Sequence, residues 1–140
     1  KYARGVALSG NTFFLGHEYH LLVEDSSQVS VGANVFDRNP DYPPGSRDAI
    51  VLADCRDCTL TGLHVTSVAA DAGLVLRRCQ RMNVTGCTIL DCAGPGVLLE
   101  EVEKTRLSGC LIHNDRPSTV PWEPIRVVGG RDNQVIENLH

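Results

Sequence analysis

The sequence predicts an all-β solenoid of about six rungs, on two observations. One short line of residues recurs six times along the 140-residue chain, and a second apolar motif lies between each pair of lines. Internal repeats of about twenty to fifty residues are typical of solenoids, in which each repeat packs on the next. We therefore expect residues 1–140 to form a single β-solenoid domain.

The first line is clearest in residues 82–89 and 105–112, which match position by position at an offset of 23 residues. Its runs are too short for helices and alternate with period two, which favours short β-strands. One apolar position recurs at spacings of 23, 29, 24, 23 and 28 residues: Leu8, Val31, Leu60, Val84, Leu107 and Val135. One turn column holds Gly10, Gly62, Gly86 and Gly109, and the next holds Asn11, Asn34 and Asn138. Glycine and asparagine tolerate positive φ, so we expect both to form tight corners.

The second motif is a strand with two distinct faces. Its inward residues are expected to be Leu21/Val23, Ile50/Leu52, Leu74/Leu76, Val97/Leu99 and Ile125/Val127. The residues between them must point outward: Leu22, Val51, Val75, Leu98 and Arg126. Four apolar side chains in one exposed column form a patch that a soluble monomer rarely leaves open. We therefore expect a second copy of the chain, another domain or a long partner to cover Leu22, Val51, Val75 and Leu98.

The six cysteines follow the same columns. Cys55 and Cys79 share a column with Val102, and Cys87 and Cys110 share the column of the asparagines. The CxxC pair Cys55–Cys58 lacks a second half with metal-ligand spacing, so no metal site is predicted. We expect buried thiol stacks, although rungs ~4.8 Å apart would also allow disulfides between stacked cysteines.

These lines and their asparagine corners resemble the right-handed parallel β-helix of the pectate-lyase-like family, over nearly the whole chain. The resemblance implies a polysaccharide lying against the stacked strands and an extracellular or periplasmic location. The sequence lacks the polygalacturonase motifs (Asn-Thr-Asp, Asp-Asp, Gly-His-Gly and Arg-Ile-Lys), the Asp-Pro-His motif of alginate epimerases and the calcium-carboxylate array of pectate lyases. None of these activities can therefore be assigned to particular residues here.

Two proline-rich insertions, residues 39–47 and 116–124, interrupt the repeat at the same corner, about three rungs or roughly 14 Å apart. We expect the groove between them to hold the polysaccharide. Glycoside hydrolysis needs two carboxylates. The family resemblance implies instead that an arginine or lysine could abstract a proton beside a uronate carboxylate in β-elimination. The candidate catalytic residues are Asp41, Asp48, Asp71, Asp115, Arg47 and Arg116. The candidate substrate-binding residues are Tyr42, Trp122, His17, Glu18, His113 and Glu123. Tyr19 and His20 are further candidates at the same corner, and His17 and His20 are expected to be surface residues of a turn.

Composition argues against several classes of function. The net charge of −4, without a basic stripe, argues against nucleic acid, and no apolar run approaches the ~20 residues of a membrane span. No cofactor is implied. Two hypotheses stay open: a carbohydrate-binding module or enzyme of the polysaccharide lyase or glycoside hydrolase type, and a structural segment that assembles through the outward apolar column. Neither end has a polar cap, so we expect the chain to be part of a longer solenoid.

Overall fold

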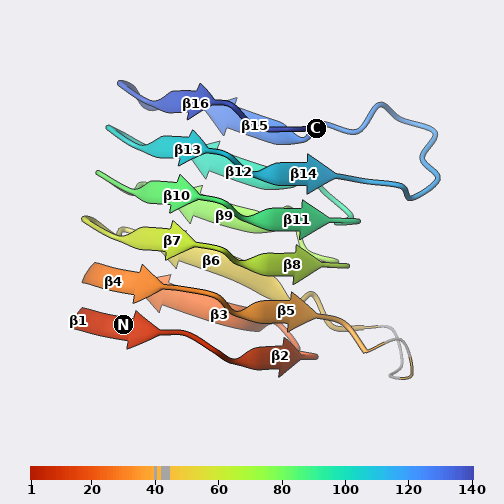
Figure 1. Ribbon diagram of the computed structural model, residues 1–140, viewed down its shortest axis with the longest axis horizontal. Helices are drawn as coiled ribbons and strands as arrows, with labels where there is room; N and C mark the ends of the chain where they lie inside the picture. The colour runs from red at the N-terminus through yellow and green to blue at the C-terminus, as the bar shows by residue number, and fades with distance from the viewer. Residues whose placement is uncertain (40, 42–44) are drawn as a thin grey trace.

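The structure, a computed structural model, describes residues 1–39, 41 and 45–140 and confirms the right-handed parallel β-helix (Figure 1). Within the described residues there are three parallel sheets and no helix. Sheet A contains β1 (Arg4–Leu8), β4 (Ser27–Val31), β7 (Thr59–Thr61), β10 (Asn83–Thr85), β13 (Arg106–Ser108) and β16 (Gln134–Ile136). Sheet B contains β2 (Thr12–Phe14), β5 (Val35–Asp37), β8 (His64–Thr66), β11 (Thr88–Leu90) and β14 (Leu111–His113). Sheet C contains β3 (Tyr19–Glu24), β6 (Ala49–Ala53), β9 (Leu74–Arg77), β12 (Val97–Glu100) and β15 (Ile125–Val128). The chain thus completes five turns and begins a sixth.

The strand register confirms the repeat. Backbone pairing joins the six residues of the predicted central column in sequence order: Leu8, Val31, Leu60, Val84, Leu107 and Val135. Because neighbouring strands are parallel and in register, like side chains stack on like. The rings of Phe13 and Phe36, for example, lie 4.8 Å apart at an interplanar angle of 9°. The core is the apolar column enclosed by the three sheets.

At the corners between sheets A and B, the glycines adopt the predicted positive φ, whereas the asparagines do not. Gly62 and Gly86 have φ of 63° and 62°. The asparagines have no positive φ and act instead through their side-chain amides. Asn34 is buried, and its Nδ2 donates to the carbonyls of Leu8 (3.0 Å) and Gly32 (2.8 Å) while its Oδ1 accepts from the backbone N–H of Asn11 (3.0 Å). The amide therefore satisfies backbone groups that would otherwise be unpaired in the interior.

Both insertions fall between a strand of sheet B and the next strand of sheet C, as predicted. Residues 39–47 connect β5 to β6, and residues 116–124 connect β14 to β15, three strands further along sheet B. Short corners connect β8 to β9 and β11 to β12 between them. In the described part of the chain, no helix has the length and apolar character to cross a membrane.

Candidate functional site

A hollow of about 280 Å³ lies on the outer face of sheet C, beside the corner that carries the 39–47 insertion. Its floor consists of small and apolar side chains: Ala49, Val51, Ala70 and Val75. Its rim is polar and aromatic: Glu18, Tyr19, Arg47, Asp71 and Arg77. Glu18, Arg47 and Asp71 are among the residues predicted from the sequence. No lining residue comes from 116–124, so this hollow uses only the first of the two loops.

Arg47 is fixed at the rim by its backbone and by an ion pair. Its N–H donates to the His17 carbonyl on the first turn (2.6 Å), and its carbonyl accepts from the Ala69 N–H on the third (3.1 Å). Its guanidinium Nη2 lies 2.9 Å from Asp71 Oδ1. Both side chains are largely exposed, so the pair contributes little to stability and stays accessible to a ligand.

The outward column of sheet C supplies part of the floor. Backbone pairing aligns its members as predicted: Leu22, Val51, Val75, Leu98 and Arg126. The expectation of a uniformly exposed patch is wrong, because Val75 is only 4% exposed at the base of the hollow, whereas Leu22 is 40% exposed. Val51 and Leu98 are half-buried. A partner that covers this column stays a prediction.

Asp48, a predicted catalytic carboxylate, is fully buried and does not line the hollow. It directly precedes β6, has φ of 56° and donates its N–H to the His17 carbonyl (3.0 Å), so the turn before the strand, rather than strand alternation, directs its side chain into the solenoid. Ser46 Oγ donates to its Oδ2 (2.6 Å), and His20 Nε2 lies 3.9 Å from its Oδ1. The expected surface position of His20 is also wrong, since its imidazole is buried.

The His20–Asp48 pair is not fully hydrogen-bonded. Both ring nitrogens of His20 and Oδ1 of Asp48 lack a partner among the described residues. Burial lowers the pKa of His20, and the charges of Asp48 and Asp37 oppose this effect. The pair is therefore an interior feature at the base of the first loop, and it is not accessible to a polysaccharide.

The second loop is anchored by Trp122. This side chain packs against the core, and its indole Nε1 donates to the Gly94 carbonyl (2.8 Å). The other predicted residues of this corner are exposed: His113, Asp115, Arg116 and Glu123. His113 Nε2 lies 3.1 Å from Asp115 Oδ1, and Glu123 Oε2 accepts from Arg126 Nε (2.6 Å). None of these residues lines the hollow beside Arg47.

Of the two remaining rim residues, Tyr19 was among the candidates named from the sequence at this corner, and Arg77 was not predicted. Tyr19 begins β3 and is 42% exposed, and Arg77 ends β9 and forms an ion pair with Glu100. Strand alternation could have identified Arg77, because it lies two residues after the outward Val75. Of the first-loop candidates, Asp41 is exposed and Tyr42 lies outside the described residues.

Comparison with known proteins identifies a family and a similar fold. Residues 1–120 match the family model described as periplasmic copper-binding protein (NosD). No curated protein sequence matches the chain significantly. A crystal structure described as a proposed glycosyl hydrolase from Parabacteroides merdae ATCC 43184 has a TM-score of 0.64 at 9% identity. The match covers 94% of this chain and 75% of that one, and at this identity it shows the fold alone.

The family description raises the question of copper ligands in this chain. Thiolates are soft ligands that favour Cu(I). All six cysteines are free and buried, and no group of three or more His, Cys, Asp or Glu side chains among the described residues could hold an ion. The described residues therefore do not fit a copper centre with three or more protein ligands.

Proposed function

The chain belongs to the NosD family, and on its β-helix we propose a carbohydrate-binding site in the hollow beside Arg47. The observation that carries this proposal is the composition of the hollow, in which an apolar floor lies next to an exposed tyrosine and a rim of paired charges. The glycosyl hydrolase described for the structural neighbour agrees with this class of ligand but does not identify it.

The hollow offers the two kinds of contact that a sugar needs. A pyranose ring has apolar C–H faces, which pack on aromatic rings, and Tyr19 presents such a ring at the rim. Sugar hydroxyls both donate and accept hydrogen bonds. Arg47 and Arg77 supply donors, and Glu18 and Asp71 supply acceptors.

Processing of the bound polymer is the second part of the proposal. Glycoside hydrolysis needs two carboxyl groups beside the scissile bond, and Glu18 and Asp71 are the carboxylates that line the hollow. Asp48 is excluded from this role because it is buried. A lyase reaction would instead rely on Arg47 or Arg77 near a uronate carboxylate.

The test is a panel of neutral and uronate-rich polysaccharides, measured for binding by calorimetry and for cleavage by new reducing ends and unsaturated products. We expect Tyr19→Ala to weaken binding about tenfold, since an aromatic contact contributes about 1.4 kcal/mol. Tyr2→Ala is the matched control, because Tyr2 is an exposed tyrosine that does not line the hollow.

Loss of cleavage but not of binding in Asp71→Asn would assign that carboxylate to catalysis. If Tyr19→Ala and Tyr2→Ala weakened polysaccharide binding equally, the binding site would not be the hollow beside Arg47. If no polymer bound, the carbohydrate proposal would fail, and assembly through Leu22 and its column would become the leading explanation.

A further inference from the structure

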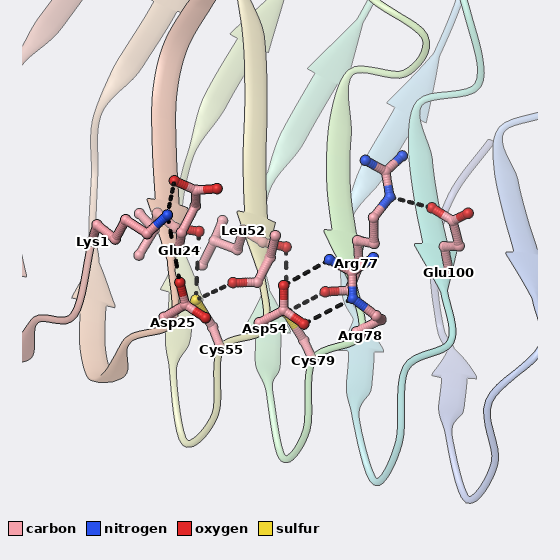
Figure 2. A network of polar contacts seen from close by, with 12 residues as sticks. Lys1, Glu24, Asp25, Leu52, Asp54, Cys55, Arg77, Arg78, Cys79 and Glu100 are labelled. Carbon is pink, nitrogen blue, oxygen red and sulfur yellow. Dashed lines mark hydrogen bonds and ion pairs between the residues drawn. The ribbon is translucent and has the colours of Figure 1, made fainter.

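Opposite charges on neighbouring turns form ion pairs along the corner between sheets C and A. Figure 2 shows one of them, in which Arg78 Nη2 lies 2.6 Å from Asp54 Oδ2 on the preceding turn. The next column repeats the arrangement, since Arg81 Nε lies 2.5 Å from Asp57 Oδ1. Each of these arginines is therefore compensated by an acid on the turn before it.

A hollow of about 430 Å³ at the start of sheet A departs from this pattern. Arg81 precedes β10, Lys104 and Arg106 lie at the start of β13, and all three line the hollow. No acid in the described part of the chain forms an ion pair with Lys104 or Arg106. Asp132 also belongs to the lining and follows Lys104 on the next turn, but it is not within ion-pair distance of that lysine. The hollow therefore carries excess positive charge on a chain whose net charge is −4.

The backbone beneath these cations is fixed by hydrogen bonds. The Arg81 N–H donates to the Glu103 carbonyl (3.0 Å). The Met82 N–H donates to Thr105 Oγ1 (3.1 Å), and the Thr105 N–H donates to Asn133 Oδ1 (3.0 Å). Met82 and Thr105 are each 2% exposed. A ligand would thus meet side chains on a preformed backbone, so that binding costs mainly the ordering of those side chains.

The chemistry of the lining favours an oxyanion surrounded by hydroxyl groups. A guanidinium matches the paired oxygens of a carboxylate or sulfate, and an ammonium adds a point charge. Arg106 lies in register between Asn83 and Gln134, whose amides can donate to and accept from sugar hydroxyls. Among the described residues that form the lining, none is an aromatic residue on which a nucleic-acid base would stack. An acidic sugar therefore fits the hollow better than a nucleotide.

We propose that this hollow is a second ligand site, separate from the one on sheet C, and that it binds the carboxylate or sulfate groups of an acidic polysaccharide. Lys104 and Arg106 hold the oxyanion, and Arg81 bounds the hollow on the preceding turn. Asp132 opposes binding by repulsion. No described residue lines both hollows, so the two sites can be tested independently.

The experiment measures the binding of dextran sulfate, polygalacturonate and neutral dextran to the folded chain by calorimetry at two salt concentrations. We expect the acidic polymers to bind, with an affinity that falls as salt is raised, and neutral dextran not to displace them. Binding of only one acidic polymer would identify the oxyanion as sulfate or carboxylate. Arg106→Ala should weaken binding about tenfold. Arg56→Ala is the matched control, because Arg56 is an exposed arginine of the same corner that lines another hollow.

Two further variants sharpen the test. Asp132→Asn should strengthen binding about two- to threefold, because it removes a repelling charge. Tyr19→Ala, at the hollow on sheet C, should leave binding of the acidic polymers unchanged. Equal losses in Arg106→Ala and Arg56→Ala would overturn the proposal, since they would indicate a general attraction to positive charge. So would the failure of both acidic polymers to bind, or inorganic sulfate or a single-stranded oligonucleotide that binds as tightly as they do.

Discussion

The buried pair of His20 and Asp48 is the least satisfied polar contact in the described interior. Three of its polar atoms have no hydrogen-bond partner, and the closest approach of the two charges is 3.9 Å. An unpaired polar group in an apolar environment destabilises the folded state by about 1–3 kcal/mol. The neighbouring ring of Phe36, with its centroid 5.8 Å from that of His20, adds no hydrogen-bonding group. The protonation state of His20 should therefore influence folding.

We predict that the free energy of unfolding decreases as the pH falls from 7.5 to 5.5. Burial lowers the pKa of His20 in the folded chain, whereas the unfolded chain has a value near 6.5, so the folded state binds the proton more weakly. The stabilisation from His20 is complete above pH 6.5 and is lost below it, by about 1 kcal/mol at pH 5.5. Urea unfolding at both pH values should show a smaller decrease for His20→Gln. The exposed His64→Gln should behave like the unsubstituted chain, and identical pH dependence in all three would contradict the prediction.

At the scale of elements, the second loop depends on Trp122 for its position. We predict that Trp122→Ala lowers the free energy of unfolding by about 3 kcal/mol, because it removes a large side chain that packs against the core and leaves the Gly94 carbonyl without its donor. Tyr19→Ala, at the rim of the hollow, should change the free energy of unfolding by less than about 1 kcal/mol. Urea unfolding monitored by circular dichroism measures both. A stability loss in Tyr19→Ala that matches that of Trp122→Ala would contradict this division between an anchoring and a binding aromatic residue.

The sequence predicted the columns well because a repeat determines which residues stack. Leu60 and Val84 could be paired from their spacing alone, and so could Cys55 and Cys79. Positions outside the repeat were less predictable. The burial of Asp48 and the packing of Trp122 depend on how two unique loops fold back, which periodicity does not describe. Likewise, Arg78 has φ of 49°, a left-handed conformation that its residue type disfavours and that the repeat alone does not predict.

At the scale of the whole molecule, each strand of the described residues pairs only with the equivalent strands of the adjacent turns. The free energy of unfolding of such a solenoid is roughly the sum of the stabilities of its turns and of the interfaces between neighbouring turns. The central strands β9 and β12 are largely buried, whereas β16 at the end of sheet A is exposed along its length. Truncating an apolar side chain of one column should therefore lower the free energy of unfolding more in a central turn than in a terminal one.

The central column allows this to be measured with one substitution at two sites. Val84 is fully buried, and Val135, in the same column, is 38% exposed. We predict that Val84→Ala lowers the free energy of unfolding by about 2–3 kcal/mol, through lost burial and a residual cavity, and Val135→Ala by less than about 1 kcal/mol. Amide hydrogen exchange should show the same gradient, with the slowest exchange in β9 and β10 and the fastest in β1 and β16. Equal losses at the two valines, with uniform protection along sheet A, would mean that the solenoid unfolds as one cooperative unit and that turn-by-turn additivity does not hold for this chain.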